Sequence, residues 1–106
     1  MIRHIVMWKL KEHAEGGDRP ANLIKMRALL ESCADLVPGM AGFTVAVAQP
    51  GLEATYDIVL DSSFDSVAAL DAYQTHPAHL AIKPFIGAVR LERQCMDFEM
   101  PEPWQA

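Results

Sequence analysis

The segment Ile2–Leu10 constrains the fold more than any other part of this sequence, because it alternates like a strand but is apolar on both sides. One side carries Ile2, His4, Val6 and Trp8, and the other carries Ile5 and Met7. A strand at the surface of a sheet normally keeps one polar side. We therefore expect this strand to lie in a sheet that is covered on both faces.

After this strand, the sequence predicts helices and further strands. Asp18 is placed to cap a helix over residues 19–37, in which apolar residues recur at spacings of three and four. Alternating segments predict strands over 43–48, 56–62 and 92–99. Asp65 or Ser66 is expected to cap a second helix, and Pro77 to open a short one that ends near Ile82 because Pro84 limits it.

This order of elements is β-α-β-β-α-β, the pattern of a ferredoxin-like α+β fold with a four-stranded antiparallel sheet. The domain is expected to span residues 1–100, followed by a tail over 101–106 in which Trp104 is a candidate to pack on an apolar patch. The predicted crossover helices cover only one face of the sheet. Since the strands are also apolar on the other face, we expect a homodimer in which a second copy covers it.

Composition and charge exclude several classes of protein. The net charge is −5 and the sequence has no basic run, which disfavours nucleic acid as a partner. No apolar run approaches the roughly 20 residues of a membrane span, and the first residues lack a signal-peptide pattern. A cytoplasmic location is the default expectation, and Cys33 and Cys95 are expected to be reduced thiols.

The segment Tyr73–His79 concentrates a phenol and two imidazoles in an otherwise apolar region. His79 would be the third residue of the helix that begins at Pro77, where free backbone N–H groups disfavour a charged imidazole. A neutral His79 is suited to act as a general base, and Tyr73 to donate a hydrogen bond to a developing enolate oxygen. The alternative is a buried tyrosine and histidine that bond to each other or to the backbone.

The other histidines and the carboxylates give weaker signals. His4 faces the same side as Val6 and Trp8, either as a core residue or as part of a pocket, and His76 is expected to cap a helix. His76 and His79 lack a third ligand at a zinc-like spacing, so we expect no metal and no cofactor. Asp57, Asp61 and Asp97 are either solvated strand-edge carboxylates or ligands of a hard cation.

Four motifs, taken with this order of elements, carry a resemblance to a known family. They are Ile2-Arg3-His4-Ile5-Val6, Tyr56-Asp57-Ile58-Val59-Leu60, His76-Pro77-Ala78-His79 and Met96-Asp97-Phe98-Glu99. With them the chain resembles the stress-responsive A/B barrel (Dabb) family, within the dimeric α+β barrel superfamily. The resemblance covers nearly all of residues 1–100. It implies a dimer whose sheets face each other, and it includes some similarity to olivetolic acid cyclase, a plant polyketide cyclase. In that enzyme residues matching Tyr73 and His79 form the catalytic pair, and one matching His4 lies in the same cavity.

The resemblance also predicts a difference from that cyclase. Leu30 and Ile58 stand where the cyclase has a tyrosine and a histidine, so the pocket here is expected to be more apolar. We therefore expect a homodimer that binds a small apolar, aromatic or polyketide-like molecule between sheet and helices. His79 and Tyr73 would be catalytic, in cyclase, isomerase or lyase chemistry, and His4, Leu30, Ile58 and Trp8 would bind the substrate. The alternatives are a non-enzymatic stress-response protein whose stable oligomer is its function, and a cofactor-less monooxygenase.

Overall fold

The computed structural model describes residues 1–101. Its elements follow one another as β1 (Ile2–Leu10), β2 (His13–Ala14), β3 (Gly17–Asp18), α1 (Arg19–Glu31), β4 (Met40–Val47), β5 (Ile58–Phe64), α2 (Val67–Thr75), α3 (Pro77–Val89) and β6 (Arg90–Glu99). The main sheet has the antiparallel order β4-β5-β1-β6. This is the ferredoxin-like α+β fold that the sequence predicts.

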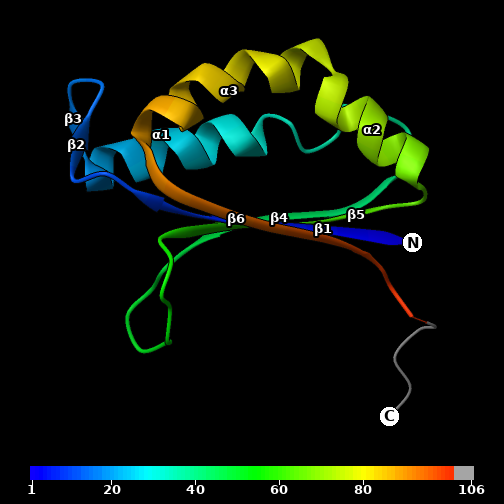
Figure 1. The fold of residues 1–106 in the computed structure, drawn as a ribbon, viewed down its shortest axis with the longest axis horizontal. Helices are drawn as coiled ribbons and strands as arrows, with labels where there is room; N and C mark the ends of the chain where they lie inside the picture. Colours follow the sequence, from blue (N-terminus) through cyan, green and yellow to red (C-terminus); the bar gives the residue numbers. More distant parts are fainter. Residues whose placement is uncertain (102–106) are drawn as a thin grey trace.

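The three main helices all lie on one face of the sheet (Figure 1). The inner side of each strand faces them, and β1 alternates as predicted, with His4, Val6 and Trp8 buried. Within residues 1–101, the opposite face carries no helix or further strand, and the loop between β4 and β5 projects away from it (Figure 1). The sheet therefore has one covered face and one open face.

The core between the helices and the sheet is apolar and closely packed. Phe64, Tyr73, Met26, Leu10 and Val89 are fully buried there. Burying side chains of this size contributes roughly 1.5–3 kcal/mol each. The core thus fixes α1 and α3 over the middle of the sheet, and with them the residues that they carry.

The first helix is shorter than the sequence predicts. It ends at Glu31 rather than near residue 37, and Ser32 forms its C-terminal cap. The Ser32 hydroxyl donates to the carbonyl oxygen of Leu29 at 2.6 Å, and the chain continues in turns through residue 35. A side chain that bonds to the preceding turn in this way competes with the regular helix ladder.

The helix that begins at Pro77 is longer than predicted, because Pro84 does not stop it. An interior proline removes one backbone bond and disfavours a helix by roughly 3 kcal/mol. Pro84 lies on the exposed side, while Ile82 and Ile86 on either side of it are buried in the core. Packing of these two isoleucines outweighs the lost bond, so α3 runs to Val89 and joins β6 directly.

The segment between β1 and α1 is more regular than the sequence predicts. The predicted loop over 11–17 contains a two-stranded hairpin, whose turn has positive φ at Glu15 and Gly16. None of the described helices has the length and apolar character needed to cross a bilayer. Trp104 and the rest of 102–106 lie outside the described residues.

Candidate functional site

A cavity of about 460 Å³ lies between the inner face of the sheet and α3. Its volume falls within the range typical of small-molecule sites. The apolar part of the lining includes Val6, Trp8, Leu30, Leu60, Ile82 and Ile86. The polar part includes His4, His79, Gln74, Lys83, Arg90 and Arg93.

His79 is the third residue of α3, held there by the proline at the first position and by the His76 cap. The Nδ1 atom of His76 accepts a hydrogen bond from the backbone N–H of Ala78 at 3.0 Å, as the sequence predicts. The Nδ1 atom of His79 lies 3.0 Å from the carbonyl oxygen of Gln74. A carbonyl only accepts, so Nδ1 of His79 carries the proton and Nε2 is left as an acceptor.

The surroundings of His79 favour the neutral imidazole. Burial lowers the pKa of His79 below its ordinary value, and electrostatic interaction with Lys83, His4 and Arg93 lowers it further. The hydrogen bond to the Gln74 carbonyl opposes this, because it stabilises the protonated form. The net shift is downward, so His79 is an unprotonated acceptor at neutral pH.

Tyr73 contacts His79 but does not line the cavity. The two rings lie with centroids 4.7 Å apart at an angle of 53°, and Phe64 packs on the phenol at 5.3 Å. The Tyr73 hydroxyl is buried and has no hydrogen-bond partner within residues 1–101. Burial, together with the nearby Cys33, raises the pKa of Tyr73 above its ordinary value, so the phenol stays protonated.

His4 enters the same cavity from β1 and is oriented by an acid on the neighbouring strand. Antiparallel pairing places His4 opposite Asp97 of β6, and the His4 Nδ1 atom is hydrogen-bonded to the Asp97 carboxylate. The His4 side chain is only 5% exposed, whereas that of Asp97 is 43% exposed. A carboxylate that accepts from one ring nitrogen fixes the orientation of the ring and leaves the other nitrogen available for a second partner.

The structure brings together most of the residues that the sequence singles out for binding. Trp8 and Leu30 line the cavity with His4 and His79. The Trp8 Nε1–H, like the Tyr73 hydroxyl, is buried without a partner in the described part of the chain. Ile58 is 2% exposed and borders a different hollow on the other side of the sheet.

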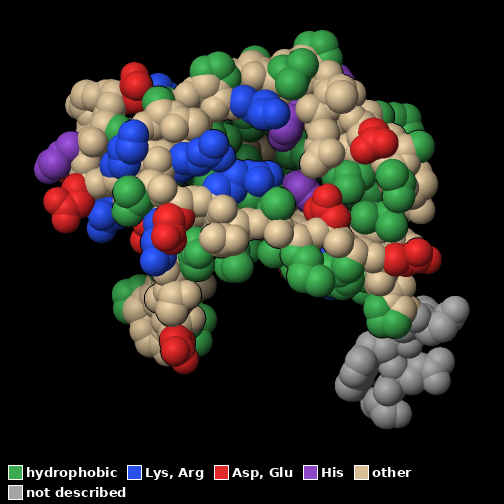
Figure 2. Space-filling view, viewed as in Figure 1, with side chains coloured by type: hydrophobic (Ala, Val, Ile, Leu, Met, Phe, Trp, Pro, Cys, Tyr) green, Lys and Arg blue, Asp and Glu red, His purple; other side chains and the backbone are tan. Residues whose placement is uncertain are grey.

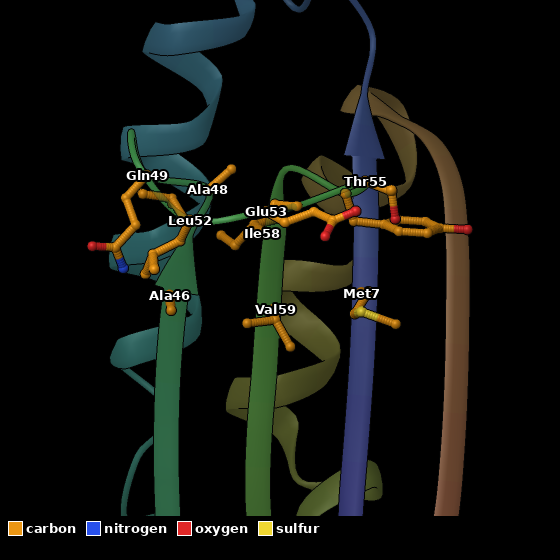
Figure 3. Close-up of a pocket in the computed structure, with 12 residues that line it drawn as sticks. Met7, Ala46, Ala48, Gln49, Leu52, Glu53, Thr55, Ile58 and Val59 are labelled. Atoms are coloured by element: carbon orange, nitrogen blue, oxygen red, sulfur yellow. The ribbon is translucent and has the colours of Figure 1, made fainter.

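That second hollow has a volume of about 370 Å³ and lies between the open face and the loop that joins β4 to β5. Figure 3 shows Ala46, Val59 and Met7 presented side by side by three neighbouring strands, with Leu52 and Glu53 of the loop next to their ends. The lining is mostly apolar, and Leu52 is 66% exposed. This hollow therefore belongs to the uncovered side of the sheet.

Comparison with known proteins identifies the family. The sequence profile of the stress responsive A/B barrel domain matches residues 2–100. The chain belongs to the stress-responsive A/B barrel (Dabb) family. No curated protein matches the sequence of this Dabb protein.

Several solved structures share the fold of this Dabb protein. A dimeric ferredoxin-like protein of unknown function from Thermobifida fusca YX is 20% identical, with a TM-score of 0.81 over 93% of this chain and 90% of that one. A dimeric protein of unknown function from Bacteroides fragilis is 26% identical, with a TM-score of 0.73 over 93% and 95%. Hydroxynitrile lyase from Passiflora edulis is 19% identical, with a TM-score of 0.73 over 98% and 96%.

Two features of this site in the Dabb protein have no local signal in the sequence. The sequence predicts Asp97 only as a solvated or cation-binding carboxylate, because its place opposite His4 depends on the register of β1 and β6. Lys83, Arg90 and Arg93 were not singled out, because they come together only where α3 passes into β6. Within the described residues, no group of three or more His, Cys, Asp or Glu side chains is placed to hold a metal ion.

Proposed function

We propose that this Dabb protein is a homodimer that binds a small, largely apolar molecule in the cavity between sheet and helices. On that molecule, His79 moves a proton without the help of a cofactor. The observation that carries the proposal is the His79 imidazole itself. Its Nδ1 is bonded to the Gln74 carbonyl, and its ring lines a cavity of about 460 Å³ together with the apolar side chains.

His79 has the properties of a general base. A neutral imidazole accepts a proton from an acidic C–H or O–H group of the ligand. Lys83 and Arg93 disfavour the imidazolium that results, so the proton is readily returned to the product. His4, held in one orientation by Asp97, is the second imidazole available to bond the ligand.

Tyr73 supports His79 as a positioning residue in this proposal. The phenol packs on the imidazole, and that face of the ring is closed to water. Its hydroxyl does not line the cavity. Direct donation from Tyr73 to an oxygen of the ligand therefore stays a prediction from the sequence.

The proposed reaction class is proton transfer next to a carbonyl or hydroxyl group, a step shared by lyases, isomerases and aldol-type cyclases. The similarity to a hydroxynitrile lyase supports this class, because it indicates that the fold is compatible with a lyase site. An aromatic or polyketide-like ligand suits the lining of Trp8, Leu30 and Leu60. A screen of small carbonyl compounds would identify the substrate within this class.

The open face of the sheet supports the homodimer. It carries Ile5, Met7, Val59 and the 67% exposed Met96, and hydrophobic side chains gather on the sheet side of the molecule in Figure 2. Two of the similar structures are described as dimeric. A second copy that packs on this face would also cover the hollow beside Leu52.

The experiment compares the parent protein with His79→Gln and with His13→Gln, a matched control at an exposed histidine outside the cavity. Small aromatic and aliphatic carbonyl compounds are screened by NMR for shifts at lining residues, and the compounds that bind are then assayed for turnover. We expect His79→Gln to lower kcat/KM by about 10²- to 10⁴-fold, and His13→Gln to behave as the parent. Equal turnover by parent and His79→Gln would refute the base, and no binding by any compound would refute the ligand.

The cavity volume supports this proposal over a purely structural role. A protein whose stable oligomer is its only function is expected to fill its interior, because an unfilled space forfeits packing energy. A cavity of about 460 Å³ that holds an unprotonated histidine favours a ligand instead. Oxygen consumption in the same turnover assays tests the monooxygenase alternative.

A further inference from the structure

The cavity has a charge opposite to that of the chain that forms it. The protein has nine Lys and Arg residues, fourteen Asp and Glu residues and a net charge of −5. Three of the nine cations, Lys83, Arg90 and Arg93, nevertheless line this one cavity, and no carboxylate is among its described lining residues. Figure 2 shows Lys and Arg side chains and histidines around the hollow between the helices and the sheet.

The three cations come from separate positions that the fold brings to one end of the cavity. Lys83 lies on α3, Arg90 is the first residue of β6, and Arg93 lies opposite Trp8 in the pairing of β6 with β1. Trp8 faces the helices, so Arg93 is on the cavity side of the sheet. All three side chains are exposed, which places the positive charge at the mouth of the cavity.

Within the described residues these cations also lack carboxylate partners, whereas three of the other six cations have one. Arg3, Lys9 and Arg27 pair with Asp61, Glu92 and Glu31. Within residues 1–101, Lys83, Arg90 and Arg93 form no salt bridge, and the contact of Arg93 is with the Cys95 sulfur at 3.4 Å. Asp97, the acid that reaches the cavity through His4, is occupied by that histidine.

Like charges placed together repel one another, and a cluster of this kind is typical of a site that binds an anion. The positive potential of the cluster also reaches the proposed base, because Lys83 and Arg93 lower the pKa of His79. Behind the charged mouth, the lining turns apolar at Val6, Trp8 and Leu60. The cavity thus has a cationic end and an apolar end.

We propose that the ligand is an amphipathic carboxylate, with its acid group bound by Lys83, Arg90 and Arg93 and its aromatic or alkyl body bound between sheet and helices. This inference rests on the proposed ligand-binding function and narrows the class of ligand. Arginine binds carboxylates through two parallel hydrogen bonds, so the acid group also fixes which part of the molecule lies next to His79.

The test uses two probes with the same carbon skeleton, the anionic 4-phenylbutyrate and the neutral 4-phenylbutan-1-ol. Binding of each is measured by NMR titration of the ¹⁵N-labelled protein, with the shifts mapped onto the lining residues. We expect the carboxylate to bind about tenfold or more tightly than the alcohol. The triple variant Lys83→Gln, Arg90→Gln, Arg93→Gln should remove this preference.

The matched control is Lys9→Gln, Lys11→Gln, Arg27→Gln, which changes the net charge equally at cations that do not line the cavity. It should keep the preference for the carboxylate. As a measurement that needs no variant, added salt should weaken binding of the carboxylate by the parent and leave binding of the alcohol unchanged.

The outcomes separate this inference from the proposed function. Equal affinity of the parent for the two probes, with shifts at the lining residues, would overturn the anion site and leave a ligand cavity. A preference that survives in the triple variant would also overturn it. If neither probe shifts the lining residues, both the anion site and the ligand-binding function fail.

Discussion

The rings of Tyr73 and His79 lie 4.7 Å apart, yet their polar atoms have different surroundings. The imidazole lines the cavity and is bonded to the Gln74 carbonyl. The phenol oxygen is buried among apolar groups and has no partner within residues 1–101. An unpaired buried hydroxyl destabilises a fold, so Tyr73 is a site where stability and function are expected to oppose each other.

Replacing Tyr73 with phenylalanine tests that opposition. We expect Tyr73→Phe to raise the free energy of unfolding by about 1 kcal/mol, because it removes a buried hydroxyl without a partner and keeps the ring packing. Chemical denaturation measures the change. Tyr56→Phe, at a half-buried tyrosine outside the core, is the control and should change stability little. A loss of stability in Tyr73→Phe would mean that the hydroxyl is bonded in solution.

The lowered pKa of His79 predicts how stability depends on pH. Below the ordinary histidine pKa of 6.5, the unfolded state takes up a proton at this residue more readily than the folded state. The stability that the neutral His79 contributes is therefore complete above that pH and is lost as the pH falls toward the folded-state pKa. His79→Gln should flatten this part of the profile in denaturation measurements, whereas His13→Gln should leave it unchanged.

The bond between His4 and Asp97 predicts a specific tautomer. Long-range ¹H–¹⁵N NMR should find the proton of neutral His4 on Nδ1, because the Asp97 carboxylate accepts from that atom. Asp97→Ala should mix the two tautomers and cost about 1 kcal/mol or less, since Asp97 is partly solvated. Asp71→Ala, at an exposed acid on α2, should leave the His4 signals unchanged. An unaltered tautomer in Asp97→Ala would count against the role of this acid.

The exposed Met96 on the open face tests the proposed homodimer. We expect Met96→Lys to dissociate the proposed dimer, because it buries a charge within an apolar interface. Sedimentation velocity measures the association, and circular dichroism checks the fold. Ile24→Lys, at a 74% exposed residue of α1, should remain a dimer. A parent protein that sediments as a monomer at micromolar concentration would refute the proposed assembly.

The fold was predictable from the sequence because each strand and helix carries its own periodic pattern. Ile2–Leu10 is a strand with the predicted bounds and sides, and the family match confirms the resemblance drawn from the same motifs. The length of α3 was not predictable from Pro84 alone, because burial of Ile82 and Ile86 outweighs the local effect of the proline. Tertiary packing decided that helix.

The candidate site was only partly predictable. His79, His4, Trp8 and Leu30 line one cavity. Their positions follow from the alternation of β1, the apolar stripe of α1 and the helix that Pro77 opens. Predicting that Asp97 is the partner of His4 requires the register between β1 and β6. The two residues are 93 positions apart in the sequence. Such a register depends on the whole sheet and on no local signal.

The alternation of β1 divides two tasks between neighbouring residues of a single strand. His4, Val6 and Trp8 face the cavity, whereas Ile5 and Met7 face the open side. Under the proposed function, substitutions at the even-numbered positions would alter ligand preference, and substitutions at the odd-numbered positions would alter self-association, each without disturbing the other. An insertion or deletion of one residue in β1 would exchange the two sets and abolish both properties at once.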